Sequence, residues 1–419
     1  MGCAGTWSRR SHDFRRRQQL RGTIFLARIL ILDGHSTAAL AVTRSAGRLG
    51  HWIAVGANEG GFAPAALSRY CSANLAYPIS TENETAFLSS VTQFVREQGI
   101  ELVIPITEWT TLPLARHRAE IERFARLALP SLESLETAAD KFRTIEIARE
   151  LGVPVPKTRL FTGSSKLDDI TSENYPAVVK DRYSVRWKDG RAVMGSVSYA
   201  YSEEELRQKV DQRIALAGDV LVQAFARGAG VGFSCMVADG KVHLPFQWQR
   251  IREVDPRGSA SSCRKAVALD SSIEDWSRRL ITAIGFTGIA MVEFKKSEQA
   301  TTLMEINGRP WGSLQLPISA GLDYPRYWID WLLKGTAPPK NVRYNAGITC
   351  RRLVGELTHL AQVRMGKPKN WPLPYPSFWS SALKIAIPWY PGVRYDEFAG
   401  KDYRPGRAIL AKWWQTHFG

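Results

Sequence analysis

Four polar residues in the C-terminal half have types and spacings suited to holding a metal ion and a phosphate. Glu305, Asn307 and Arg309 stand two positions apart, and Glu293 lies twelve positions before Glu305. Because side chains alternate faces along a strand, the three residues spaced by two should project together. Two carboxylates and an amide oxygen are hard ligands suited to Mg2+ carried on a nucleotide's phosphates, with Mn2+ as a second candidate. Arg309 could hold a phosphate or a carboxylate with its planar fork.

These residues need a hairpin to bring them together. Two apolar runs, Ile289–Phe294 and Thr301–Ile306, flank the polar link KKSEQA, which predicts antiparallel strands joined by a short turn. Pairing of the strands brings the two glutamates together, while Met304 and Ile306 are expected to point into the core. The alternative is a surface hairpin whose charges face water. The Asn and Gly of EINGRP, and Pro310 at its end, are unusual in a plain surface strand and favour the metal site.

Two lysines precede the hairpin in positions that suit phosphate. Lys180 ends the short strand YPAVVK, and a point charge on such a strand suits a phosphate group. The stretch from Leu132 to Gly152 predicts a turn followed by a helix, which Asp140 could cap and in whose first turn Lys141 falls. A cation there opposes the helix dipole, which is an unfavourable place for a charge without a function.

Arg250 and Arg252 form a third candidate group. They stand two apart at the end of a predicted strand, can share one face, and precede a Gly-Ser-Ala-Ser-Ser loop. Such a loop can offer backbone N–H groups and hydroxyls to an anion. The alternative, a basic edge strand followed by a flexible loop, is equally compatible with the sequence.

Taken in order, these motifs resemble those of a known superfamily. The segments ARILILDGHSTAALAVTRSAGRLGH, AADK, YPAVVK, DVLVQAF, EINGRP and AGLDYP resemble the ATP-grasp carboxylate–amine ligases, the broad group around carbamoyl-phosphate synthase and D-aspartate ligase. The resemblance covers roughly residues 28 to 337, and the order and spacing of the motifs carry it more than any one of them.

The resemblance implies roles for residues outside the hairpin. Lys141 and Lys180 would bind the nucleotide's phosphates. The end of the strand VLVQAF would be the hinge that reads the adenine edge, with Gln223, Ala224 and Phe225 as its candidates. The polar segment after Lys180 would be the loop that covers the triphosphate.

The resemblance also implies a reaction. ATP would phosphorylate a substrate carboxylate, and an amine or other nucleophile would attack the acyl phosphate, with Arg309, Arg250 and Arg252 stabilising the transferred group. A carboxylase-like or phosphorylating enzyme is an alternative, as is a degenerate scaffold that binds a membrane surface or nucleic acid. The expected partners are a small carboxylate and an amine, without nucleic acid, and a homo-oligomer is compatible with the sequence.

The N-terminal part predicts a small parallel sheet. Three apolar runs alternate with two helical segments, a pattern typical of parallel strands joined by right-handed crossovers: 28–32, 38–49, 51–56, 84–98 and 101–106. The GHST turn after the first strand, and Thr107–Glu108 after the third, fall where such sheets bind ligands. Capping of the following helices is the alternative for both.

The fold class is therefore mixed α/β and α+β, in four sections. Residues 1–27 form a basic, disordered extension, 28–130 a Rossmann-like domain, 131–337 an ATP-grasp domain of two α+β subdomains, and 338–419 a basic extension rich in Trp and Pro. The net charge of +16 belongs to the two ends, because thirteen Lys or Arg face four acids in 340–419 while the middle is nearly neutral. The charge alone thus does not indicate a nucleic-acid enzyme.

Compartment and membrane contact follow from the same composition. No apolar run reaches the roughly 18 residues of a membrane helix, and the five cysteines are scattered, which predicts a cytoplasmic protein. Residues 341–419 contain five Trp, and the stretch FWSSALKIAI at 378–387 could lie in a membrane interface. We expect this extension to pack on the catalytic core, with peripheral membrane contact as the less favoured alternative.

Overall fold

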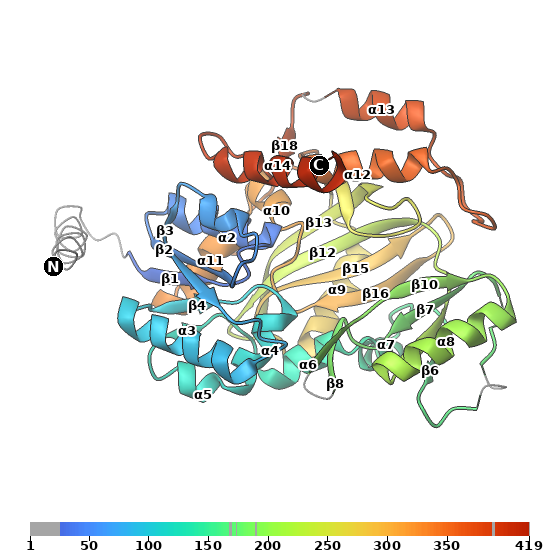
Figure 1. Ribbon diagram of the computed structural model, residues 1–419, viewed down its shortest axis with the longest axis horizontal. Helices are drawn as coiled ribbons and strands as arrows, with labels where there is room; N and C mark the ends of the chain where they lie inside the picture. The colour runs from blue at the N-terminus through green and yellow to red at the C-terminus, as the bar shows by residue number, and fades with distance from the viewer. Residues whose placement is uncertain (1–25, 167–169, 173, 189–190, 388–389, 419) are drawn as a thin grey trace.

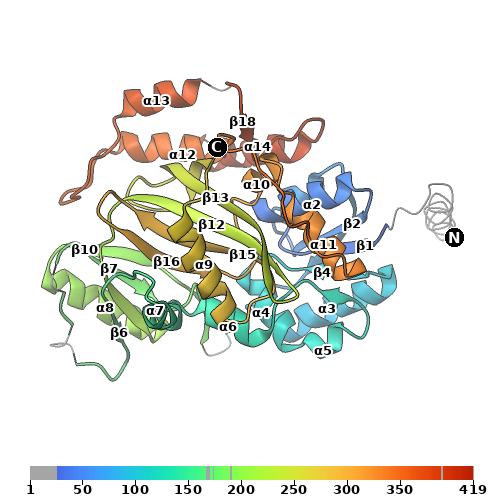
Figure 2. The same ribbon diagram turned by 180° about the vertical axis from the view of Figure 1, so that it is seen from behind.

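The chain folds around three main sheets, as the computed structural model in Figure 1 shows. The structure describes residues 26–166, 170–172, 174–188, 191–387 and 390–418. The predicted disordered extension lies almost wholly outside these residues. Figure 1 and the reverse view in Figure 2 place the N-terminal domain beside a large central sheet, with a smaller sheet below it and the C-terminal helices above.

The N-terminal domain is the predicted parallel sheet, with two additional strands. Its five strands lie in the order β3-β2-β1-β4-β5 and are β1 (Arg28–Ile31), β2 (Trp52–Asn58), β3 (Cys71–Tyr77), β4 (Leu102–Ile104) and β5 (Arg126–Leu127). The connecting helices are α2 (Thr37–Arg48), the 3-10 helix η1 (Pro64–Leu67), α3 (Glu84–Gln98), α4 (Glu108–Arg116) and α5 (Arg118–Ile121). Strand β3 has no clear apolar run in the sequence, because it is an edge strand whose residues are mostly half-exposed or exposed.

Two short helices lead to the smaller sheet. They are α6 (Leu132–Ala139), where a turn was expected, and α7 (Lys141–Glu150), the expected helix. The smaller sheet has the order β10-β7-β11-β6, built from β6 (Thr158–Phe161), β7 (Ala177–Asp181), β10 (Val197–Ala200) and β11 (Val220–Ala224). Helix α8 (Glu203–Ala217) packs on it through Leu206 and Val210. A separate hairpin, β8 (Val185–Lys188) and β9 (Arg191–Met194), replaces the loop that was expected after Lys180.

The third sheet carries the predicted metal hairpin. Its order is β16-β15-β12-β13-β14-β17-β18, with β12 (Ala229–Ala238), β13 (Lys241–Glu253), β14 (Ser261–Val267), β15 (Gly288–Lys296), β16 (Thr301–Asn307), β17 (Thr349–Arg351) and β18 (Val393–Tyr395). Helix α9 (Ser271–Ala283) covers one face through Ile273, Leu280 and Ile281. On the other side, α10 (Gln315–Ser319) and α11 (Tyr324–Lys334) join this sheet to the N-terminal domain in one continuous core. The fold is thus the mixed α/β architecture that was predicted, with two α+β subdomains after the parallel sheet.

The C-terminal section is part of the third sheet as well as an appendage. Strand β17 pairs antiparallel with β14, and β18 pairs parallel with β17. Three helices complete the section, α12 (Leu353–Arg364), α13 (Phe378–Ala386) and α14 (Arg404–Phe418). Among the described residues, no helix is both long and apolar enough to cross a bilayer.

Candidate active site

The floor of the candidate site is the hairpin of β15 and β16. Glu293 lies opposite Glu305 in the ladder, and Met291 lies opposite Asn307. The amide Nδ2 of Asn307 donates to Oε1 of Glu305 at 3.1 Å, which leaves the amide oxygen for another partner. The pairing of strands therefore brings the three predicted metal ligands together.

A bulge corrects one detail of this hairpin. The ladder shifts register between Glu293 and Phe294, so Phe294 pairs with Leu303 and Met304 is the extra residue. Leu303 and Ile306 enter the core, whereas Met304 is only half-buried. The expectation that Met304 points into the core was wrong, because strict alternation does not hold across a bulge.

The two glutamates differ in their electrostatic surroundings. Burial raises the pKa of Glu293; Arg250 opposes this rise, and the neighbouring carboxylates of Glu305 and Glu253 add to it. Burial also disfavours the charged form of Glu305, but Lys141, Asn307 and Lys180 outweigh it and lower the pKa of this carboxyl. Buried, adjacent carboxylates with only oxygen atoms to offer fit a divalent cation, since such an ion relieves their mutual repulsion.

Both predicted lysines reach toward Glu305. Lys180 is 7% exposed, and burial together with Lys141 lowers its pKa to about 8 against the pull of Glu305. Burial also lowers the pKa of Lys141, although Glu305 and Glu108 act in the opposite direction. The ammonium of Lys141 donates to the hydroxyl of Ser184 at 3.0 Å. Two cations within each other's field, one buried and one half-buried, have a strong tendency to bind an anion.

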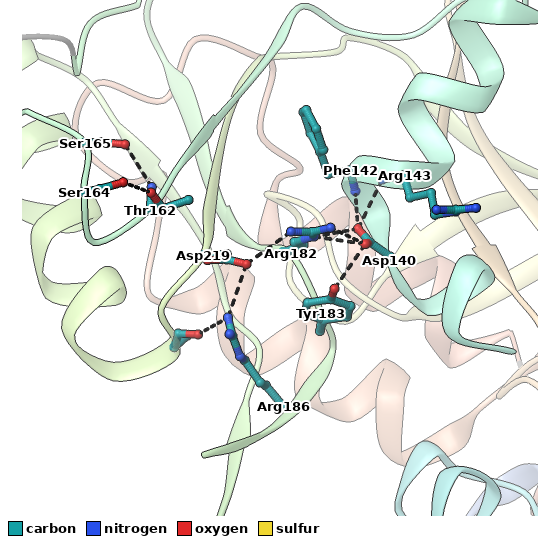
Figure 3. A network of polar contacts seen from close by, with 11 residues as sticks. Asp140, Phe142, Arg143, Thr162, Ser164, Ser165, Arg182, Tyr183, Arg186 and Asp219 are labelled. Atoms are coloured by element: carbon teal, nitrogen blue, oxygen red, sulfur yellow. Dashed lines mark hydrogen bonds and ion pairs between the residues drawn. The ribbon is translucent and has the colours of Figure 1, made fainter. Parts of the chain in front are cut away.

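Asp140 joins the helix that carries Lys141 to the segment after β7, as Figure 3 shows. Its carboxylate caps α7, as predicted, by accepting from the backbone N–H groups of Phe142 at 3.0 Å and Arg143 at 3.1 Å. It also accepts from the guanidinium of Arg182 at 2.6 Å and from the hydroxyl of Tyr183 at 3.1 Å. Asp140 thus fixes the start of the β8–β9 hairpin against α7.

Arg309 forms an ion pair with the N-terminal domain. Its Nε lies 2.8 Å from Oε1 of Glu108, in the first turn of α4. Behind Glu108, the buried carboxylate of Asp33 accepts from the backbone N–H of Thr107 at 2.7 Å and from the hydroxyl of Thr110 at 2.6 Å. Thr107 starts α4 without a side-chain cap. The alternative for Thr107 and Glu108 was that they cap α4. The missing side-chain cap and the ion pair with Arg309 instead favour a place for Glu108 in the candidate site.

The two arginines at the end of β13 bind different parts of the protein. A register shift falls between them, so Arg250 binds Glu293 and Glu253, whereas Arg252 pairs with Glu356 of α12 at 2.6 Å. The expectation that both share one face was wrong. Arg250 belongs to the candidate site, while Arg252 is an anchor for the C-terminal section.

The three hinge candidates are placed at the end of β11. The side-chain amide of Gln223 donates to the hydroxyl of Thr158 at 2.8 Å, and the backbone N–H of Ala224 donates to the carbonyl of Lys157 at 2.8 Å. Phe225 stacks edge-on against Tyr199 and Trp371. Gln223 thus has a structural partner, and the ring of Phe225 is held from two sides.

Several residues of the site have no distinct signal in the sequence. Glu253 pairs with Arg250, Ser184 accepts from Lys141, and Asp33 accepts from Thr107. No motif in the sequence around these three residues indicates such contacts. A cleft of about 560 Å3 also opens beside the site, between α4, α6, α7 and β8, and its lining includes Glu108, Asp140, Tyr183, Ser184 and Arg186. Only the fold brings these segments together.

The chain is similar to proteins of known structure and function. A family model described as "ATP-grasp in the biosynthetic pathway with Ter operon" matches residues 218–355. The carbamoyl phosphate synthase large chain of Rubrobacter xylanophilus is 26% identical over 224 residues, which cover 51% of this chain and 20% of that protein. The chain thus spans about a fifth of the length of the curated relatives that it matches.

Solved structures resemble most of the chain. An L-amino acid ligase from Bacillus licheniformis superposes with a TM-score of 0.58 at 19% identity, covering 74% of each chain. The biotin carboxylase domain of the Hydrogenobacter thermophilus 2-oxoglutarate carboxylase, solved with ADP, its magnesium salt and bicarbonate, has a TM-score of 0.57 at 17% identity, covering 76% of this chain and 71% of that one. Together with the matched family model and the placement of the motifs, these similarities establish that the chain contains an ATP-grasp domain and has the fold of the ATP-grasp enzymes.

Proposed function

We propose that this protein is an ATP-dependent carboxylate–amine ligase. One observation carries the proposal, namely the half-buried carboxylate of Glu305, which lies opposite Glu293 and in the field of both Lys141 and Lys180. The site therefore has a positive half and a negative half. The two lysines suit phosphate oxygens, and the two carboxylates suit a metal ion. The relatives of the chain support an enzyme that uses ATP.

The lysines would bind the phosphates that stay on the nucleotide. Lys180 is buried and Lys141 half-buried before any ligand arrives, so their charges have less solvation than those of exposed lysines. A phosphate would restore favourable interactions to both ammonium groups. Asp140 ties the start of the β8–β9 hairpin to α7 close to Lys141, and the hairpin would shield the bound phosphates from water.

Glu293, Glu305 and Asn307 would hold Mg2+. When bound, the ion neutralises charge on the phosphate oxygens and orients them for transfer. Arg250 already pairs with Glu293, so this carboxylate would be shared between the guanidinium and the metal. The pair fixes the orientation of the Glu293 carboxylate.

The chemistry then needs positioning more than an activated side chain. A carboxylate oxygen of the substrate would attack the γ-phosphorus in line, the bond from that phosphorus to the bridging oxygen would break, and ADP would leave. Arg309 would stabilise the transferred phosphoryl group, since Glu108 holds its guanidinium in one orientation. An amine would attack the acyl carbon, expel inorganic phosphate and lose its proton to solvent.

The N-terminal domain would select the carboxylate substrate. It contributes Glu108 to the candidate site, and Asp33 anchors the start of α4 behind it. An acid at this edge suits a substrate that carries a positive amino group beside its carboxylate. Amino acids are therefore the first class of substrates to test.

The test is a screen of amino acids and small carboxylates, alone and in pairs, for release of ADP and phosphate, with the product identified by mass. The variant Glu305→Ala should abolish turnover while leaving the fold intact. Glu298→Ala is its matched control, because Glu298 is an exposed residue in the turn of the same hairpin. Wild-type rates of ADP release by a folded Glu305→Ala protein would refute the proposed role of this carboxylate.

A further inference from the structure

The acidic residues of the C-terminal section are all buried. Residues 340–419 contain four acids, and Glu356, Asp396, Glu397 and Asp402 are each 4% exposed or less. Three of them pair with arginines of the preceding part of the chain: Glu356 with Arg252, Asp396 with Arg264, and Asp402 with Arg44. Negative charge in this section therefore serves to fix it to the rest of the protein.

The surface of the section consequently carries charge of one sign. Eleven of its thirteen Lys and Arg residues are exposed, among them Arg364, Lys367, Lys369, Lys384, Arg407 and Lys412. Since none of its acids reaches the surface, this positive charge is not balanced within the section. Such a surface attracts polyanions over a distance of about 10 Å at ordinary ionic strength.

Helix α13 adds an apolar face to this basic surface. It packs against α12 and is the outermost helix of the C-terminal section in Figures 1 and 2. Ser381 is its buried residue, whereas Trp379 is 80% exposed, Leu383 69% and Ile387 51%. Trp379 and Leu383 stand four apart on the helix and so share one face of it, with Lys384 on the flank, and the exposed Ile387 follows directly at the C-terminal end of the helix.

We propose that the outer face of α13 docks on an anionic lipid bilayer. Trp, Leu and Ile would enter the boundary between headgroups and acyl chains, and Lys384 with the surrounding basic residues would meet the lipid phosphates. The expected packing of this section on the core is compatible with docking, because β17, β18 and the buried ion pairs hold the section in place while α13 faces outward. The docking surface is thus the α13 stripe (Trp379, Leu383, Ile387) and its basic surroundings.

A second copy of the chain fits this surface less well. A two-fold interface centred on α13 would bring the same basic surface of both copies together, and the section exposes no acid to compensate. A bilayer with anionic headgroups supplies both the apolar layer and the negative charge. In Figure 1 α13 lies at the top of the molecule and β8 at the bottom, so docking would leave the cleft beside β8 open to substrates.

The test is sedimentation of the full-length protein with vesicles of phosphatidylglycerol and phosphatidylcholine, and with phosphatidylcholine alone. We expect binding only to the anionic vesicles, weakening as salt rises. Leu383→Glu should weaken binding by about tenfold or more, and Lys384→Gln by about fivefold, the effect of one positive charge near the surface. Leu216→Glu is the matched control, because Leu216 is an exposed leucine (55%) on α8, the helix that packs on the smaller sheet.

The design separates the alternatives. The Arg-rich N-terminal residues are present in every variant, so their contribution stays constant, and equal binding by wild type, Leu383→Glu and Lys384→Gln would overturn the proposal. Binding to neutral vesicles with the same affinity, or to neither kind, would also overturn it. A dimer in analytical ultracentrifugation that Leu383→Glu dissociates, without vesicle binding by the wild type, would instead identify an interface between copies. Thermal unfolding of both α13 variants at the wild-type temperature confirms that the fold is retained.

Discussion

Replacing Lys180 with methionine should make the nucleotide-free protein more stable while abolishing ATP binding. Lys180 lies on β7 and is 7% exposed, and its neighbours include a second cation, Lys141. Methionine retains most of the aliphatic stem and removes the charge, so the packing of β7 against β11 should persist. The perturbation thus isolates the cost of holding a charged ammonium ready for a phosphate.

The magnitude follows from the pKa of Lys180. The fold lowers it from the ordinary value of 10.5 to about 8, and each pKa unit corresponds to about 1.4 kcal/mol. The unfolded chain therefore holds this proton more tightly than the folded protein, so the wild type loses about 3 kcal/mol of stability below pH 8 and recovers it as the pH rises from about 8 to 10.5. Lys180→Met should gain about 3 kcal/mol at pH 7, and the gain should shrink as the pH approaches 10.5.

Urea unfolding at pH 7 and pH 9.5 measures this difference, and calorimetric titration with Mg-ATP measures the loss of binding. Lys265→Met is the control, because Lys265 is an exposed lysine on β14, and its substitution should change the free energy of unfolding by less than about 0.5 kcal/mol. A Lys180→Met protein that is no more stable than the wild type at pH 7 would refute the reasoning. So would an equal gain at both pH values, since the effect would then not come from the proton.

Three further predictions concern the site and its supports. Arg309→Lys should slow single-turnover phosphoryl transfer by about 100-fold with little change in ATP affinity, because a point charge replaces the fork held by Glu108; a loss of affinity at an unchanged rate would reverse the assigned role. Asp140→Ala should lower the free energy of unfolding by about 2 kcal/mol in urea titrations, because the cap of α7 and the ion pair with Arg182 are both lost; stability equal to the wild type would contradict this. Deletion of residues 341–419 should give aggregates in size-exclusion chromatography, because Arg264 loses its buried partner and β14 becomes an exposed edge; a monodisperse product would show that the section is dispensable.

Local patterns in the sequence were sufficient for the elements that carry the chemistry. The β15–β16 hairpin follows from two apolar runs and a polar turn, and its pairing puts Glu293 opposite Glu305 without help from distant residues. The capping of α7 by Asp140 is equally local, since the donors lie two and three residues ahead. The order of the motifs, read along the chain, also indicated the fold that the structure has.

Contacts across long distances in sequence were decided by tertiary packing alone. Nothing near Arg309 indicates that Glu108 is its partner, because the pair forms only when α4 of the N-terminal domain packs beside the hairpin. Arg250 and Arg252 look equivalent in sequence, yet a bulge sends one to Glu293 and the other to Glu356. A bulge depends on how a strand fits both of its neighbours, which the strand's own residues do not specify.

In the C-terminal section, too, the sequence does not show which charges are exposed. Its basic excess is plain in the sequence, but whether its few acids lie at the surface is not. In the folded protein all four are buried, and three of them pair with arginines, two of which, Arg44 and Arg264, lie more than a hundred residues away from their partners in sequence. The sequence therefore determines the amount of charge, and the tertiary structure determines which charges remain exposed, because burial and pairing depend on segments that meet only on folding.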